Sequence, residues 1–210
     1  MENGRITDGT LLLYGGTFAP PHLGHVHAVR TVHEILHPDC VLIMPTAVPP
    51  HKQQVKGDTA EIRLEMCRAA FEEIPDTYVS SYEIDKGGVS YTVDTLEYLK
   101  TKAERLLLLC GSDMFLTLGT WRNAQRIFEL ASIVCMPRYK ADTENLLRQK
   151  LQYEKTYGGR MILIENRVRV LSSTEVRQKI VSGEDLTDVL PKAVIRIIRR
   201  EKLYLQEETE

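Results

Sequence analysis

Two histidines three residues apart follow a glycine-rich segment near the N-terminus. The stretch GGTFAPPHLGH occupies residues 15–25, and the two glycines that open it have no Cβ, so backbone amides there can approach a ligand closely. We expect a helix to begin at Leu23 or Gly24, which places His22 and His25 on neighbouring positions of its first turn. Free amides, the positive end of the helix dipole and imidazole N–H donors together favour the binding of a phosphate.

A metal site is the alternative interpretation of these histidines. All six histidines of the chain fall within its first 51 residues, and His22, His25 and His27 together with the pair His33 and His37 could hold zinc. His27 faces elsewhere on a helix, however, and no cysteine or carboxylate lies near the loop to complete a tetrahedral set. We therefore assign no metal ligand here and interpret His27, His33 and His37 as surface or helix-end residues.

A second candidate anion site lies in the stretch LSSTEVRQKIVSG, near the other end of the chain. Ser172 and Glu175 fit a capping box at the start of a helix, and this interpretation is purely structural. It does not require the other polar residues of the stretch. Ser173 and Thr174 lie beside free amides in the first turn, and Arg177 follows on the same face, so the three can form a second cradle for an anion. From these residues alone both interpretations stay open.

Short apolar runs, separated mostly by segments with helical spacing, must position both cradles. Four of the runs are nearly continuous in apolar residues, as strands covered on both faces are. Strands that alternate with helices predict a parallel sheet wrapped by helices, in which ligands bind beyond the carboxyl ends of the strands. The cradles follow the first and last runs and can lie close together if those strands are neighbours or if the connection brings them there. The predicted strands are 10–14, 40–45, 77–84, 105–111, 132–137 and 161–165.

The length of 210 residues and the hydrophobic content of 43% suit one well-buried domain. We expect a single domain over residues 1–210, with a helical segment at about 173–204 packed on it and a frayed tail at 206–210. Amphipathic spacing predicts helices over 60–74, 91–103 and 190–204.

Composition excludes several classes of partner. The formal charge of -2, with acids and bases interspersed, gives no basic patch for nucleic acid. The N-terminus does not resemble a signal peptide, and no run approaches the roughly 20 apolar residues of a membrane helix, so we expect no membrane partner and a cytoplasmic location. A homo-oligomer is left open. Reduced, buried thiols are expected at Cys40, Cys67, Cys110 and Cys135, which form no CxxC pair.

The two cradles resemble the (H/T)xGH and ISSTxxR motifs of the nucleotidyltransferase superfamily. His22, Gly24 and His25 match the first motif, and LSSTEVR matches the second with leucine in place of isoleucine. Within the superfamily the chain most resembles the bacterial nicotinate-nucleotide adenylyltransferase family. Further matching stretches cover nearly the whole chain in the family's order, and they are VPPHK at 48–52, SYTVDT at 90–95, GSDMF at 111–115 and then Trp121.

The resemblance implies a Rossmann-like α/β fold with a mostly parallel central sheet flanked by helices. It also implies an enzyme of NAD biosynthesis that converts nicotinate mononucleotide and ATP to nicotinate adenine dinucleotide and pyrophosphate, with Mg²⁺. The attacking phosphate is already ionised, so positioning and preorganised donors can carry the catalysis. The same chemistry on nicotinamide mononucleotide or phosphopantetheine is an alternative, and a non-catalytic nucleotide-binding module is an alternative of another class.

The resemblance also implies roles for individual residues. His22, His25 and Arg177 would be catalytic. Trp121 would stack on the pyridine ring, and Thr92 would hydrogen-bond the nicotinate carboxylate or its surroundings. The full set for ATP would be Gly16, Thr17, Phe18, His22, His25, Gly111, Asp113, Ser173, Thr174 and Arg177, and the set for the mononucleotide would be Lys52, Thr92, Asp113 and Trp121.

Some of these residues also have purely structural interpretations. Trp121 can be a half-buried packing residue, Thr92 can simply begin a helix, and Lys52 can be a solvated loop charge. Ala19 departs from the family's pattern, which usually has an acidic residue there, so any loop-bracing or metal-linked role of that carboxylate is either missing here or met elsewhere. The family's pattern is also not kept at Thr46 or in the stretch MPRYK at 136–140.

Overall fold

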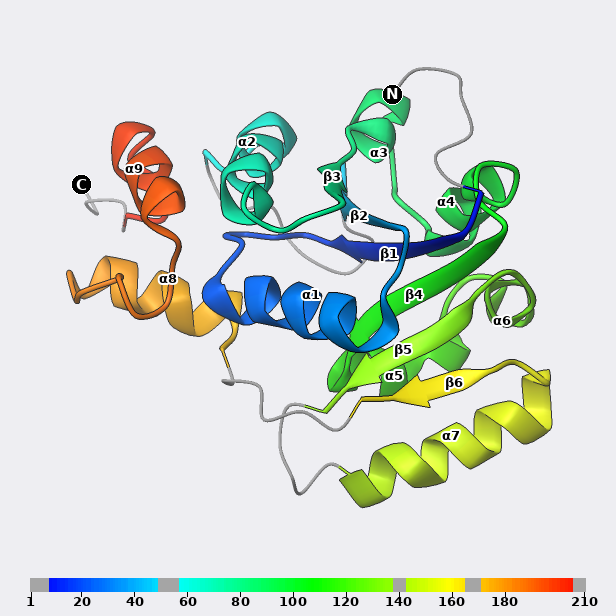
Figure 1. Cartoon of the computed structure of the whole chain (residues 1–210). Coiled ribbons are helices and arrows are strands. Elements are labelled where there is room, and N and C mark those ends of the chain that lie inside the picture. The colour runs from blue at the N-terminus through cyan, green and yellow to red at the C-terminus, as the bar shows by residue number, and fades with distance from the viewer. Residues whose placement is uncertain (1–7, 49–56, 138–142, 165–170, 206–210) are drawn as a thin grey trace.

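The computed structural model describes residues 8–48, 57–137, 143–164 and 171–205 (Figure 1). Six strands of this part of the chain form one sheet in the order β3-β2-β1-β4-β5-β6. All five pairings between neighbouring strands are parallel, which confirms the predicted parallel sheet. The strands are β1 (Thr10–Gly16), β2 (Cys40–Pro45), β3 (Thr77–Val79), β4 (Arg105–Gly111), β5 (Ser132–Met136) and β6 (Met161–Leu163).

Helices cover both faces of the sheet, and side chains alternate between those faces along each strand. Leu12 and Leu109 belong to the core shared with α1, α2, α8 and α9, while Leu11 and Leu108 belong to the core shared with α4 to α7. The strands are therefore buried on both sides. The helical elements are α1 (Leu23–Leu36), α2 (Ala60–Phe71), α3 (Tyr82–Lys86), α4 (Thr92–Leu99), α5 (Ser112–Thr117), η1 (Leu118–Thr120), α6 (Ala124–Leu130), α7 (Thr143–Tyr157), α8 (Ser173–Val181) and α9 (Lys192–Arg200).

The strand order reverses at the centre of the sheet. β1 pairs with β2 on one side and with β4 on the other, so chain connections leave β1 and β4 in opposite directions. In open parallel sheets the crevice beyond the carboxyl ends of such strands is where ligands bind. The loop after β1 therefore occupies the position where this topology favours a ligand.

One predicted strand is too long. The run 77–84 forms β3 only as far as Val79, because β3 is the edge strand and the serines that follow it start a helix. The Ser80 hydroxyl accepts a hydrogen bond from the Tyr82 backbone N–H, and the Tyr82 ring stacks on Tyr98 with 3.7 Å between centroids. The end of the predicted run thus belongs to α3.

The other predicted elements have the expected type and somewhat different ends. The helices predicted over 60–74, 91–103 and 190–204 correspond to the shorter α2, α4 and α9, and the segment 173–204 consists of α8, a connection and α9. All four cysteines are buried and carry free thiols, as predicted. The tail 206–210 and Lys52 lie outside the described residues. Among those described, no helix has the length and apolar character needed to cross a membrane.

Candidate active site

The two histidines of the first loop cap the helix that follows them. His22 is the N-cap of α1, and its Nδ1 accepts a hydrogen bond from the backbone N–H of His25 at 3.3 Å. The His25 Nδ1 accepts in return from the backbone N–H of His22 at 3.1 Å. This is a capping box made of two imidazoles. Because both Nδ1 atoms accept, each neutral ring carries its proton on Nε2 and can donate from there.

The same pair is held as a stacked unit. The ring centroids of His22 and His25 lie 3.6 Å apart with 20° between the planes. A Cβ at Gly24 would lie 3.0 Å from Nδ1 of His22 and 3.3 Å from Cβ of Leu171, so the glycine gives room both to the buried His22 ring and to the first residue of the second motif. The spacing HxGH therefore brings two donors together and lets the C-terminal segment approach them.

The remaining histidines of α1 lie away from this pair. His27 is exposed, His33 lies in the last turn and His37 is the exposed C-cap. These positions match the interpretation of all three as surface or helix-end residues.

The loop between β1 and α1 wraps its aromatic residue into the core. Phe18 is buried, has a positive φ of 51°, and meets the His25 ring edge-on with 5.1 Å between centroids. A Cβ at Gly16 would approach the Phe18 ring to 3.2 Å, so the absent side chain makes room for that ring. Gly16, Thr17 and Phe18 can thus meet a nucleotide through backbone groups, while the Phe18 side chain supports the histidine pair.

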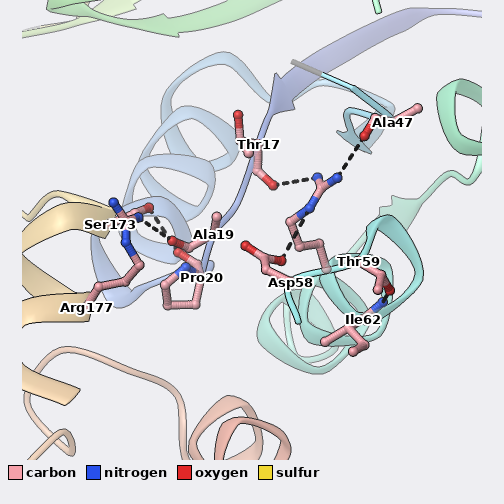
Figure 2. Close-up of polar contacts among 10 residues, drawn as sticks. Thr17, Ala19, Pro20, Ala47, Asp58, Thr59, Ile62, Ser173 and Arg177 are labelled. Carbon is pink, nitrogen blue, oxygen red and sulfur yellow. Dashed lines mark hydrogen bonds and ion pairs between the residues drawn. The ribbon is translucent and has the colours of Figure 1, made fainter. Parts of the chain in front are cut away.

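The second motif lies directly against this loop (Figure 2). Arg177 donates from Nη1 to the Ala19 carbonyl oxygen at 2.8 Å and from Nη2 to Thr174 Oγ1 at 3.2 Å. The Ser173 hydroxyl donates to the Pro20 carbonyl oxygen at 3.1 Å. Because a guanidinium has five N–H donors, these contacts leave Arg177 able to donate to a ligand as well. Side chains more than 150 positions away in the chain therefore meet the first cradle.

The start of α8 forms the capping box of its structural interpretation. The Ser172 hydroxyl accepts from the Glu175 backbone N–H at 3.1 Å, and the Glu175 carboxylate accepts from the Ser172 backbone N–H at 2.8 Å. The capping box is thus present, and the residues outside it turn to the first loop. The Leu23 backbone N–H also donates to the Val189 carbonyl at 2.9 Å, which ties the start of α1 to the segment after α8.

A buried arginine that the motifs did not single out lies behind the loop. Arg63 is 1% exposed, donates to the carbonyl oxygens of Thr17 at 2.8 Å and Ala47 at 3.0 Å, and lies 3.4 Å from the carboxylate of Asp58 (Figure 2). One feature of the sequence could have indicated this arginine. The spacing of α2 puts Arg63 on the same buried face as Met66, where a charged residue is rare unless it is paired.

Burial also perturbs the partners of this arginine. It raises the pKa of Asp58 to about 6, although the guanidinium groups of Arg63 and Arg177 and the Tyr204 hydroxyl act in the opposite direction. The pKa of Tyr204 is raised above its usual range by its own burial and by the charge of Asp58. The C-terminal tyrosine and the loop after β1 therefore share one buried polar cluster with α2.

Comparison with known proteins identifies the family. The model of the cytidylyltransferase-like family matches residues 13–179. A Clostridium botulinum (strain Eklund 17B / Type B) protein named "Probable nicotinate-nucleotide adenylyltransferase" is 34% identical over 195 residues, covering 93% of this chain and 98% of the relative. A relative of the same name from Clostridium perfringens (strain SM101 / Type A) is 32% identical over 197 residues, with the same coverage. The chain belongs to the nicotinate-nucleotide adenylyltransferase family.

Solved structures agree with this assignment at the level of the fold. The Plasmodium falciparum nicotinic acid mononucleotide adenylyltransferase complexed with NaAD matches with a TM-score of 0.70 at 15% identity, over 93% of this chain and 97% of that one. The same enzyme complexed with APC matches with a TM-score of 0.67 at 14% identity, with the same coverage. The Rossmann-like nucleotidyltransferase fold that the resemblance implied is confirmed.

A nicotinate-nucleotide adenylyltransferase must also hold a second substrate, and the residues expected to do so lie along other strand ends. Gly111 ends β4, the neighbour of β1, and Asp113 is exposed in the first turn of α5. Thr92 is the first residue of α4, as its structural interpretation also had it. Trp121 is half-buried and packs against the core that the sheet shares with α4 to α7.

One contact brings two of these segments side by side. The guanidinium of Arg122 lies over the Tyr91 ring, 4.4 Å from its centroid, so the residue after Trp121 touches the residue before Thr92. The half-buried Trp121 ring packs on the core, as its structural interpretation required, and part of its surface stays exposed.

Proposed function

We propose that this adenylyltransferase transfers the AMP group of ATP to nicotinate mononucleotide. An oxygen of the mononucleotide phosphate attacks the α-phosphorus of ATP, and a new P–O bond forms to give nicotinate adenine dinucleotide. The bond from the α-phosphorus to the bridging oxygen breaks, and its electron pair leaves with pyrophosphate. The attacking phosphate is already an anion, so the protein needs donors for the developing charge rather than a strong base.

The observation that carries this proposal is the meeting of the two cradles. The hydrogen bond from Arg177 to the carbonyl of Ala19 and that from Ser173 to Pro20 bring the start of α8 to the loop that precedes α1. One polyphosphate can then contact amides, imidazoles and a guanidinium at once. We assign the Nε2 donors of His22 and His25 to the transferred phosphate and the leaving oxygens.

The second motif would take the far end of the triphosphate. Ser173, Thr174 and Arg177 lie at or near the start of α8, where backbone amides and the helix dipole favour negative charge. We assign them to the β- and γ-phosphates. Gly16, Thr17 and Phe18 would contact the nucleotide through the backbone, and Gly111 and Asp113 would meet the ribose or its neighbouring groups.

ATP enters as its magnesium complex in this proposal. Mg²⁺ in nucleotide sites usually keeps several waters and is held by substrate phosphates with one or two carboxylates. The described residues hold no group of three or more His, Cys, Asp or Glu side chains arranged for a metal. We assign most of the ligands of the ion to water and to the triphosphate itself.

The mononucleotide would bind at the segments that Arg122 joins. We assign ring stacking to Trp121 and the carboxylate contact to Thr92 or its surroundings, with Lys52 adding charge from a segment outside the described residues.

Four buried free thiols suit a reducing compartment, and we infer that the enzyme works in the cytoplasm.

The experiment is an assay of pyrophosphate release with Mg²⁺, ATP and each acceptor in turn. Nicotinate mononucleotide is expected to give the highest kcat/KM, above nicotinamide mononucleotide and phosphopantetheine. A higher value for either of the other acceptors would replace the substrate while keeping the chemistry. Tight ATP binding without turnover on any acceptor would instead support a nucleotide-binding module.

A further inference from the structure

The buried guanidinium of Arg63 joins two loops that follow neighbouring strands. Its Nη1 donates to Thr17, directly after β1, and its Nη2 donates to Ala47, two residues after β2. These two strands pair in register up to Gly16 opposite Pro45. The planar fork of the guanidinium therefore spans the carboxyl ends of two adjacent strands and fixes the separation between their loops.

The loop after β2 is in turn bonded to the segment that leads into α4. The Ala47 backbone N–H donates to the Ser90 hydroxyl at 3.1 Å, and the Ser90 backbone N–H donates to the Val48 carbonyl at 3.2 Å. Two residues later α4 begins at Thr92. Ala47 thus uses its carbonyl toward Arg63 and its N–H toward Ser90.

A second buried contact anchors α4 at the same place. The Thr95 hydroxyl donates to the Glu83 carboxylate at 2.6 Å, and both side chains are buried. This contact fixes α4 against α3. The chain of contacts from Thr17 through Arg63, Ala47 and Ser90 therefore ends on a well-anchored helix start.

Placing an arginine here is costly, which argues that its contacts matter. A buried charge must lose its water, and its ion pair with a buried carboxylate often contributes no more stability than apolar residues of the same volume would. Arg63 and Asp58 are 1% and 6% exposed. Arg63 donates two directed hydrogen bonds to loop carbonyl oxygens, and a leucine or methionine at this position would donate none.

We propose that Arg63 is a positioning residue that holds the nucleotide loop after β1 and the acceptor-side residues Ala47 and Ser90, which lead to the start of α4, in the relative placement that in-line transfer requires. This inference rests on the proposed function, in which the first loop binds ATP and the start of α4 binds the mononucleotide. Misplacing two reactants by about 1 Å can cost on the order of 10²-fold in rate. The loss therefore falls on kcat more than on the binding of either substrate alone.

The test uses Arg63→Lys, which keeps the charge without the fork, and Arg63→Met, which keeps much of the volume without the charge. Arg68→Met on the exposed face of the same helix is the matched control. We expect both Arg63 variants to lower kcat by about 10²-fold, with the dissociation constant of ATP, measured by calorimetry, changed much less. Arg68→Met should match the wild type.

A further readout separates positioning from a purely structural role. In Arg63→Ala, millimolar methylguanidinium should raise kcat in a saturable way, since it restores the fork without the chain, and methylammonium should not. Ser90→Ala tests the same link from its other end without touching the core, and we expect it to lower kcat about fivefold, the effect of one hydrogen bond.

The outcomes are distinguishable from those of the proposed function. If the wild type does not turn over nicotinate mononucleotide, the proposed function itself fails. If the wild type turns it over while Ser90→Ala and the folded Arg63 variants keep a near wild-type kcat, the positioning role is overturned. Variants that lose only thermal stability, with full kcat per folded molecule, would likewise make Arg63 a packing residue.

Discussion

Arg177 donates a hydrogen bond to the backbone carbonyl of Ala19 at 2.8 Å, across 158 positions of the chain. The pattern of the resembled family implies an acidic side chain at that position, and here the contact with the second motif uses a main-chain oxygen instead. A main-chain acceptor does not depend on the identity of the side chain. The contact therefore explains how the loop can be held to the second motif when residue 19 is alanine.

Removing this guanidinium should impair catalysis more than folding. We expect Arg177→Met to lower kcat/KM for ATP by about 10²-fold, the effect of one preorganised charge donor. Arg177→Lys should recover only part of this, because an ammonium lacks the planar fork. Steady-state kinetics would measure both. Arg148→Met, which breaks an exposed pair with Glu144, should leave the kinetics unchanged, and equal losses in both methionine variants would remove Arg177 from the site.

His22 can be tested with its cap preserved. Asn is a good N-cap residue, so His22→Asn should keep the start of α1 while removing the Nε2 donor. We expect kcat to fall by about 10²-fold with a change in unfolding free energy of about 1 kcal/mol or less. Kinetics and urea unfolding on the same sample would check this. A variant that loses stability and keeps its turnover would make His22 a cap only.

His25 contributes the second ring of the stack. We expect His25→Ala to lower turnover by about 10²-fold or more, since both the Nε2 donor and the stacking partner of His22 are lost. Pyrophosphate release under saturating substrates measures the effect. Near-full activity would exclude His25 from the mechanism, and His27→Ala, at an exposed position of the same helix, serves as the matched control.

A substitution at Trp121 should affect the binding of the two substrates differently. We expect Trp121→Ala to weaken the binding of nicotinate mononucleotide while ATP binding is largely kept, because the ring would stack on the pyridine. Trp121→Phe should retain part of the affinity. Calorimetric titration with each substrate is the measurement. An equal loss for both substrates would indicate a general loss of packing, since the ring also contacts the core.

The sheet could be predicted because its signals are local. Four nearly continuous apolar runs required burial on both faces, and the structure divides their side chains between two cores, with Leu12 on one face and Leu11 on the other. The run at 77–84 was harder, because the residues at the end of an edge strand can suit either a longer strand or the start of a helix. In the structure the Tyr82 backbone N–H donates to the Ser80 hydroxyl, and the helix α3 begins at this point.

The site could be predicted only where side-chain type carries the information. Two histidines and a run of hydroxyls with an arginine indicate an anion, so the motifs pointed to both cradles. The partners of Arg63 are carbonyl oxygens of Thr17 and Ala47, which every residue type offers alike. The residue types at positions 17 and 47 therefore could not show that the two loops converge on one buried guanidinium.

The stability of the protein should report the ionisation of Asp58. Burial raises the pKa of this carboxyl from 3.8 to about 6 in the folded state, so the folded protein keeps a proton that the unfolded chain has already lost. Relative to Asp58→Asn, the unfolding free energy of the wild type should therefore fall by on the order of 2–3 kcal/mol as pH rises from about 4 to 6. Above that range it should stay level.

Urea unfolding of both proteins across pH 4–8 measures the difference, in which the contributions of the other carboxyls cancel. Asp185→Asn is the control, because a hydrogen bond from Thr187 lowers the pKa of that exposed carboxyl from its ordinary value of 3.8. Its contribution to stability is lost only as pH falls below that value, so the difference for Asp185 should stay nearly level across pH 4–8. A wild-type advantage at Asp58 that grew with pH would mean that the ion pair with Arg63 outweighs the burial of the charge.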